Sequence, residues 1–242
     1  MKSILLCAIA ALSVAVSSCS SPLSDTNVTD PSLLEPRLAI RKAITTSGAI
    51  TIEYLADIYD KNLNLVTLQN GNVRIENYQM NQRANLLGGI EYYLTGESEV
   101  SFSLNKTYSF TLTLSDGSTY NGSVTSQTDD LVRFDVPSIQ SRTQSINVTW
   151  SSTDPNAEMW IQMATRYKTD SSQGVAYQTL RIANPAAQSY TITPSQFSTA
   201  EGTAYEVDLT LVSEMKGTID PRFRSGSGTV CDMSIDRVVK LN

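Results

Sequence analysis

Alternating apolar and polar residues run through most of the chain, and residues 107–126 show this pattern most clearly. Four apolar side chains there alternate with threonines and serines, namely Tyr108, Phe110, Leu112 and Leu114. Successive side chains of a strand point to opposite faces, so these four are expected on one buried face. Asp116-Gly117 follows, and glycine accepts the positive φ of a tight hairpin turn. The pattern predicts a β-hairpin whose return strand occupies 118–124.

Shorter alternations occupy residues 49–54 and 71–78. In the second half, turn formers separate six further strand-like segments, at 144–152, 158–167, 175–182, 189–197, 203–215 and 228–241. This spacing of short strands is typical of a β-sandwich. We therefore expect an all-β protein with two consecutive immunoglobulin-like sandwiches, residues 37–134 and 135–242. The boundary lies near Pro137, because proline cannot donate to a central ladder; a single larger sandwich is the alternative.

Three landmarks characterise the second half. Trp150 stands near the end of the second strand expected there, residues 189–197 form a strand followed by a turn, and Tyr205 lies early in the sixth strand. In these features residues 136–242 resemble a fibronectin type III domain. The resemblance implies that Trp150 belongs to the core and that Tyr205 is a tyrosine-corner residue.

The N-terminal residues have a different pattern. Lys2 precedes an apolar run from Ile4 to Val16, which is shorter than the roughly 20 residues of a membrane-spanning helix. Residues 1–18 are therefore predicted to be a secretory signal. The residues at its end, Val16-Ser17-Ser18-Cys19, resemble the bacterial lipobox. This resemblance implies cleavage before Cys19 and attachment of fatty acyl chains such as palmitate to it, and the alternative is an ordinary signal with an uninvolved cysteine.

Two features extend this prediction beyond the signal. Serine follows Cys19, which resembles the sorting pattern of outer-membrane lipoproteins in Gram-negative bacteria, so we expect a lipid-anchored protein of the cell envelope. Residues 19–36 are rich in serine, aspartate, threonine, asparagine and proline and lack periodicity. Such a segment is expected to be a flexible tether between the lipid and the first sandwich.

Charge and cysteine content narrow the function classes. The net charge of −6 and the pI near 4.7 provide no basic footprint for nucleic acid. Of the three cysteines, Cys7 leaves with the signal and Cys19 would carry lipid, so Cys231 has no partner for a disulfide. A single cysteine in a strand is expected to be a buried, inert thiol.

Catalytic motifs are sparse. The chain has no histidine, which excludes Ser-His-Asp and Cys-His arrangements and histidine metal ligands. Nucleophile elbows, phosphate-cradling glycine loops and dinucleotide fingerprints are also missing from the sequence. The adjacent acids Asp129 and Asp130 are expected to solvate a turn. We predict no enzymatic activity and no cofactor, although two carboxylates about 5–10 Å apart in a cleft would favour a glycan-active enzyme.

Ligand-binding candidates come from strand parity and turn composition. The oxygen-rich turns 115–118 and 152–158 lack the spacing of an EF-hand loop, so we expect turn chemistry and no metal site.

Trp160 should point outward if its neighbours face the core, and an exposed tryptophan can stack on a sugar ring or anchor a partner. Packing under a loop or against the first sandwich is the alternative for this ring. Tyr92 and Tyr93 should place one ring on each face of their strand.

Together these features predict a lipid-anchored, non-catalytic binding or structural module. Its partner would be an envelope protein or a glycan, and its candidate ligand-binding residues are Trp160, Tyr92 and Tyr93. A glycan-active enzyme or a carbohydrate-binding accessory protein is the alternative.

Overall fold

A computed structural model describes residues 21–84, 89–95, 100–151 and 153–242. The predicted signal and lipobox, including Cys19, lie outside these ranges. The regular secondary structure of the described chain is almost entirely strand, with short helical turns η1 (Pro22–Asp25), η2 (Pro31–Leu33), η3 (Pro185–Ala187) and α1 (Pro194–Phe197).

The strands of the described residues form three sheets. The main sheet has nine strands, ordered β13 (Gln173–Arg181), β12 (Glu158–Lys168), β15 (Thr203–Lys216), β17 (Gly228–Leu241), β1 (Glu35–Ile44), β2 (Ile50–Tyr59), β6 (Ile90–Thr95) and β5 (Asn81–Ala84), with β10 (Ile139–Gln140) beside β17. The second sheet is ordered β16 (Thr218–Ile219), β8 (Thr119–Thr125), β7 (Thr107–Thr113), β3 (Asn72–Ile75) and β4 (Tyr78–Gln79). The third is ordered β14 (Ser189–Ile192), β11 (Ile146–Trp150) and β9 (Phe134–Asp135).

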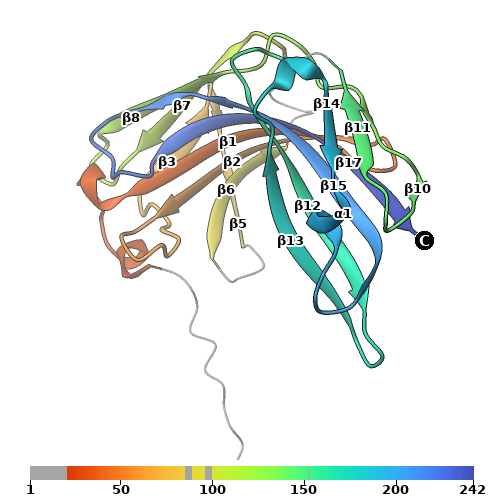
Figure 1. Ribbon diagram of the computed structural model, residues 1–242. Helices are drawn as coiled ribbons and strands as arrows, with labels where there is room; N and C mark the ends of the chain where they lie inside the picture. The colour runs from red at the N-terminus through yellow and green to blue at the C-terminus, as the bar shows by residue number, and fades with distance from the viewer. Residues whose placement is uncertain (1–20, 85–88, 96–99, 152) are drawn as a thin grey trace, which may run out of the picture.

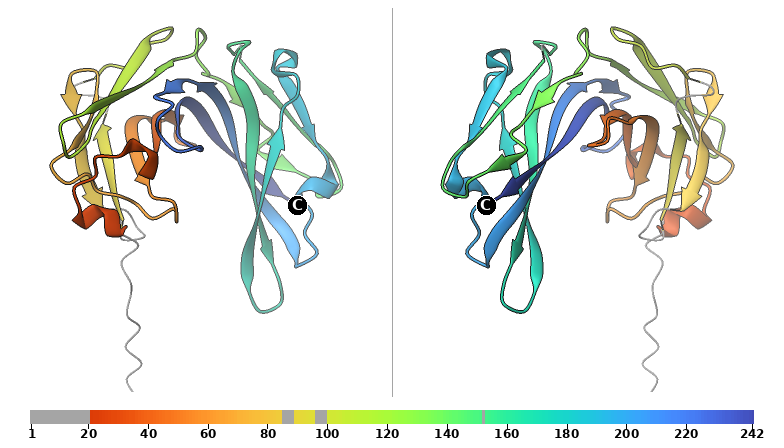
Figure 2. Two further views of the ribbon diagram at one scale, coloured as in Figure 1. Left: turned by 90° about the vertical axis from the view of Figure 1, so that its left-hand side faces the viewer. Right: turned by 90° about the vertical axis from the view of Figure 1, so that its right-hand side faces the viewer.

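The main sheet bends into an arch, and the two smaller sheets cover its outer sides (Figures 1 and 2). Each smaller sheet forms a β-sandwich with one half of the main sheet. The fold is therefore all-β with two consecutive sandwiches, and the second has the immunoglobulin-like, fibronectin type III-like arrangement. This agrees with the fold class predicted from the strand pattern.

Strand β17 joins the two sandwiches. It runs antiparallel to β15 and parallel to β1, from the pair Arg37 and Gly228 to the pair Ile44 and Ile235. Cys231 lies in the core of the first sandwich, whereas Ile235 lies in the core of the second. Residues beyond the predicted boundary thus take part in both sandwiches.

The hairpin in residues 107–125 confirms the parity argument. Its apolar side chains are fully buried, namely Tyr108, Phe110, Leu112 and Leu114. Gly117 has φ +83°, as the turn requires. In the second sandwich Trp150 is fully buried as predicted, and its indole Nε1 donates to the carbonyl of Pro185 at 3.3 Å.

Tyr205 differs from its predicted role as a tyrosine corner. Its ring is only partly buried and lies 4.8 Å from Lys168 Nζ. Its hydroxyl contacts the Gln173 side chain at 3.4 Å instead of bonding back to the upstream backbone. A register shift between β12 and β15 accompanies this position, and Ala204 contributes to the core instead. Local parity could not reveal that shift.

Residues 21–34 differ from the predicted flexible tether. Ser21, Val28 and Leu34 are buried, with exposed fractions of 2%, 2% and 0%. Hydrogen bonds hold the segment to the first sandwich, including Val28 N to Ser115 Oγ at 2.9 Å and Thr67 N to Ser24 Oγ at 2.9 Å. These hydrogen bonds and the buried apolar side chains attach the segment to the first sandwich, although Thr26, Asn27 and Asp30 remain exposed.

Hydrogen bonds and an ion pair hold the connection between the sandwiches in place. Asp154 is buried and accepts hydrogen bonds from Thr128 N and Thr128 Oγ1, both at 3.0 Å. Asp130 pairs with Lys42 Nζ at 2.5 Å, and Lys42 is mostly buried at the junction. Asp130 therefore contributes an ion pair to the junction. This differs from the prediction that the adjacent acids Asp129 and Asp130 solvate a turn.

Candidate functional site on the open face of the arch

The underside of the arch is the face of the main sheet that neither smaller sheet covers (Figure 2). Its side chains alternate with core residues along β1, β2, β12, β15 and β17. Three hollows of about 570, 420 and 350 Å³ lie along it. Glu214 borders the first and second hollows, and Thr179 borders the first and third, so the three hollows adjoin one another in a row along this face. We call this row of hollows the arch groove.

Trp160 lies in the largest hollow, beside Arg181 and Lys216. Its neighbours on β12 confirm the parity on which the prediction rested, because Met159, Ile161 and Met163 are all 3% exposed or less. The ring itself is partly buried, and Pro155 and Pro185 also border the hollow. Its role in binding stays a prediction.

Tyr177 is the aromatic residue that the sequence reasoning missed. Its side chain is 83% exposed and borders the third hollow with Gln162 and Asp208. Tyr177 stands opposite Ala164 on β12. The alternation in 175–182 predicts a strand but not its exposure, because the exposure of β13 depends on its place at the edge of the main sheet.

Tyr92 and Tyr93 point to opposite faces of β6, as predicted. Tyr92 is 1% exposed, and its hydroxyl accepts a hydrogen bond from Leu68 N at 2.7 Å. It therefore belongs to the core and is closed to a ligand in this conformation. Tyr93 is partly exposed, and the Arg83 guanidinium lies 4.6 Å from its ring centre.

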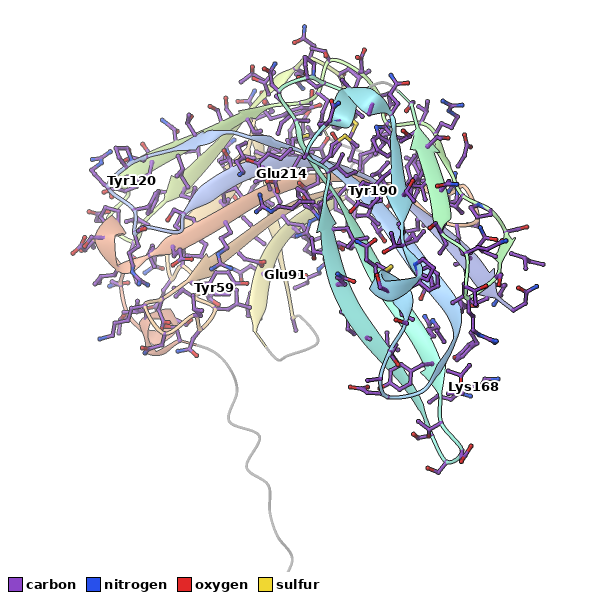
Figure 3. All side chains as sticks on the ribbon, in the orientation of Figure 1. Tyr59, Glu91, Tyr120, Lys168, Tyr190 and Glu214 are labelled. Carbon is purple, nitrogen blue, oxygen red and sulfur yellow. The ribbon has the colours of Figure 1, made fainter. Side chains whose placement is uncertain are left out.

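Two carboxyl groups meet at the centre of the arch groove. Glu214 on β15 and Asp232 on β17 are cross-strand neighbours and hydrogen-bond to each other (Figure 3 labels Glu214). Burial, followed by the charge of Glu214, raises the pKa of Asp232 to about 7. Burial also raises the pKa of Glu214. Because like charges this close cannot both ionise readily, the pair holds a shared proton near neutral pH.

Charged residues continue along the groove beyond this pair. Arg41 Nε lies 3.9 Å from Asp232 Oδ2. Further along, the Arg37 guanidinium lies 4.8 Å from the centre of the Tyr59 ring. Burial, followed by the charge of Glu91, raises the pKa of Asp57 in the same hollow. The floor of the groove is thus polar and of mixed charge, with aromatic rings at intervals.

The geometry bears on catalysis in two ways. Glycosidase carboxyls stand apart on either side of the scissile bond, whereas Glu214 and Asp232 contact each other.

Ser213 and Lys216 have the S-x-x-K spacing of a serine–lysine pair, which the sequence reasoning also missed. Residues three apart on a strand point to opposite faces. Ser213 is 1% exposed, and Lys216 pairs with Glu158 at 2.6 Å, so the two side chains do not meet.

The oxygen-rich turns show turn chemistry. Asp116 Oδ1 accepts from Ser118 N at 3.0 Å, and Asp154 Oδ1 accepts from Asn156 N at 2.8 Å. Over the ranges that the structure covers, no cluster of three or more acidic or cysteine side chains is arranged to hold a metal ion. Cys231 is fully buried, and burial raises the pKa of its thiol to about 12, in agreement with an inert cysteine.

Within the described residues, no helix has the length and apolar character needed to cross a bilayer.

Comparisons with known proteins leave the family open. No protein-family model and no curated protein matches the chain. Among solved structures, the Yersinia pseudotuberculosis adhesin InvE is 17% identical, with 84% of this chain and 58% of that chain covered and a TM-score of 0.23. The FN1–FN3 domains of chicken CNTN1 are 10% identical, with coverage of 85% and 68% and a TM-score of 0.23.

A third structure, Yersinia pseudotuberculosis InvD, is 13% identical, with coverage of 86% and 68% and a TM-score of 0.21. TM-scores this low do not show a common overall arrangement. The fold assignment therefore rests on the strand pairing, and the function is argued from the groove.

Proposed function

We propose that this chain is a lipid-anchored protein of the bacterial envelope, held through Cys19, whose arch groove binds an oligosaccharide without catalysing a reaction. The observation that carries the binding proposal is the pair of aromatic side chains on the open face. Trp160 stands opposite Arg181, and Tyr177 stands opposite Ala164. Their positions differ by four residues along neighbouring strands, or about 13 Å.

Amide, hydroxyl and charged groups lie between and beside these rings. Gln162, Thr179 and Thr210 border the hollow at Tyr177, and Arg181 borders the one at Trp160. Aromatic rings pack on the apolar faces of sugars, while flanking polar groups bind their hydroxyls. The spacing of the rings suits a chain of sugars better than a single one. Of the two partner classes expected from the sequence, this pattern favours the glycan.

The carboxyl pair supports a non-catalytic role for the groove. Because Glu214 and Asp232 hydrogen-bond to each other, neither stands across a space that would admit a glycosidic bond and a water molecule. A glycan-active enzyme would need the pair to separate when substrate binds. Release of reducing ends from a bound oligosaccharide would support that alternative and contradict the proposal.

The anchor is supported by the apolar signal followed by Val16-Ser17-Ser18-Cys19. Serine after the cysteine favours the outer membrane. Two or three acyl chains hold a protein firmly on a bilayer, whereas one chain binds only reversibly. We expect the wild-type protein to fractionate with membranes and to carry acyl mass on an N-terminal Cys19. The Cys19→Ser protein should be a soluble form or an uncleaved precursor.

Calorimetric titration of the purified protein with a panel of neutral and acidic oligosaccharides tests the binding proposal. Trp160→Ala should weaken binding of any oligosaccharide that the wild type takes, by about tenfold or more. Tyr78→Ala is the matched control, because Tyr78 is an exposed aromatic residue of β4, in the sheet on the outer side. Equal weakening by both variants, or no binding by the wild type, would overturn the assignment of the groove.

A further inference from the structure

The chain enters the first sandwich at a fixed point immediately after the predicted acylation site. Ser21 N donates to the Leu65 carbonyl at 2.8 Å, and Ser21 Oγ donates to Asp60 Oδ2 at 2.7 Å. Asp60 is 4% exposed and also accepts hydrogen bonds from Asn62 N at 2.7 Å and Asn64 N at 2.9 Å. Two peptide links separate Ser21 from position 19, a distance that covalent geometry limits to about 7 Å. A lipid on Cys19 would therefore hold this corner of the fold at the bilayer.

Apolar and cationic side chains gather at the same corner. A hollow of about 410 Å³ lies between the η1–η2 segment and the loop 60–64, and it is lined by Leu23, Leu33, Asp60, Lys61, Asn62 and Arg224, with Ser32. Leu33 is 44% exposed, and Leu63 in the loop is 60% exposed. Arg224 Nη1 is buried without a hydrogen-bond partner in the described chain, 4.0 Å from Glu35 Oε2.

We propose that this corner, comprising Leu33, Lys61 and the hollow that they border, together with Leu63 in the adjoining loop, is a membrane-contact surface that rests on the phospholipid headgroups of the bilayer holding Cys19. The two leucines reach the boundary between headgroups and acyl chains, Lys61 faces the lipid phosphates, and Arg224 lines the hollow behind them. Basic and apolar side chains in this combination are what an interfacial protein surface presents to lipid. The proposal rests on the lipid anchor of the proposed function.

The backbone at Leu63 adds an independent observation. Leu63 has φ +61°, a left-handed conformation that leucine rarely adopts and that glycine and asparagine accept more easily. Neither this conformation nor the 60% exposure of the side chain favours leucine at position 63 on structural grounds. Contact between that leucine and lipid supplies a reason for the residue at this position.

The arrangement also orients the groove. In Figure 2, η1 lies at the foot of one leg of the arch, and the hairpin between β12 and β13 lies at the foot of the other. Lys168, at the end of β12, is labelled near that second foot in Figure 3. A bilayer under the η1–η2 corner would therefore lie below the opening of the arch, and a ligand in the groove would be held close to the membrane surface.

Site-specific fluorescence on the acylated full-length protein tests the contact. Leu33→Cys, Leu63→Cys and Val132→Cys are each labelled with an environment-sensitive dye and reconstituted in vesicles of phosphatidylethanolamine and phosphatidylglycerol. Val132 is the matched control, since it is 60% exposed like Leu63 but lies in the connection between the sandwiches. Cys231 is fully buried and does not compete for the label.

Lipid-borne quenchers should reduce the emission of the labels at 33 and 63 about twofold more than the emission at 132. Equal quenching at all three positions, in protein whose intact mass shows the acyl chains, would overturn the membrane-contact surface and leave the anchor in place. A mature protein without acyl mass would overturn both.

Leu63→Asn separates lipid contact from folding. Asparagine accepts the φ of +61° better than leucine, so the melting temperature should be unchanged or higher. Quenching of a label at position 33 should nevertheless fall toward the level seen at 132, because one of the two apolar contacts is lost. Val132→Asn should leave that quenching unchanged. Undiminished quenching in the Leu63→Asn protein would contradict a role for Leu63 in the contact.

Discussion

The side chain of Gln127 is hydrogen-bonded to Cys231, across the junction of the two sandwiches. Gln127 Nε2 donates to the Cys231 carbonyl at 3.0 Å, and Cys231 Sγ donates to Gln127 Oε1 at 3.5 Å. The same amide donates to the Ser213 carbonyl at 2.8 Å. Because Gln127 is 1% exposed and Cys231 is fully buried, these bonds lie out of water and tie the connection between the sandwiches to β15 and β17.

Gln127→Leu should lower the free energy of unfolding by about 1–3 kcal/mol, because the substitution leaves buried carbonyl groups without their donor. Urea titration followed by tryptophan fluorescence measures the change. Gln178→Leu is the control, since Gln178 is exposed on β13 and should change stability by less than about 0.5 kcal/mol. Equal effects of the two substitutions would show that the junction bonds contribute nothing specific.

Trp150→Ala should destabilise the protein by about 3–5 kcal/mol, through lost burial and the cavity that remains. The ring is fully buried in the second sandwich, where Phe134 and Ile192 belong to the same core. Tyr177→Ala, which removes an aromatic ring that is 83% exposed, should change stability little. A loss below about 1 kcal/mol for Trp150→Ala in the same titration would contradict its place in the core.

Stability should fall as pH rises from about 4 to about 7, because of the carboxyl pair. Burial, followed by the charge of Glu214, raises the pKa of Asp232 to about 7, whereas an aspartate in the unfolded chain titrates near 3.9. Between these values the folded state binds the proton that the unfolded state has released, so raising the pH favours unfolding. By pH 8 the cost is on the order of a few kcal/mol.

Asp232→Asn should therefore raise stability at pH 8 and flatten its dependence between pH 4 and pH 7, as followed by thermal melts across that range. Arg41, Glu158 and Lys216 also face the pair and remain in the variant. Asp220→Asn is the control: hydrogen bonds from Arg222 lower the pKa of Asp220 to about 2. Its contribution is present above the unfolded pKa and is lost only at acid pH. An unchanged pH profile for Asp232→Asn would contradict the shared proton.

A fragment ending at residue 134 should not fold by itself. It lacks β16, which pairs with β8, and the half of β17 that pairs with β1. It also lacks Phe223, whose ring lies 5.3 Å from that of Tyr120 in the first core. Circular dichroism and amide exchange on residues 21–134 measure the outcome. A cooperative unfolding transition in this fragment would show that the first sandwich is independent of the second half.

Much of the fold could be predicted because a strand carries its own periodicity. The faces of the 107–125 hairpin and of β12 follow from alternation over a few residues, and the Asp116-Gly117 turn follows from the conformational freedom of glycine. The core position of Trp150, the outward parity of Trp160 and the burial of Cys231 all follow from such local patterns. For these positions the sequence by itself was sufficient.

Pairing between distant strands was decided only by the tertiary structure. No pattern in the local sequence indicates that β1 pairs with β17 or that Ser21 hydrogen-bonds to Asp60. Three-dimensional packing decides which strand pairs with a given sheet edge and which group binds a buried hydroxyl. The arch groove depends on that same pairing, since Glu214 and Asp232 become neighbours only when β15 and β17 align. Alternation along the chain fixes the two faces of a strand, except where a bulge shifts the register, as at Tyr205; the long-range pairing of strands then places outward side chains such as Glu214 and Asp232 beside each other.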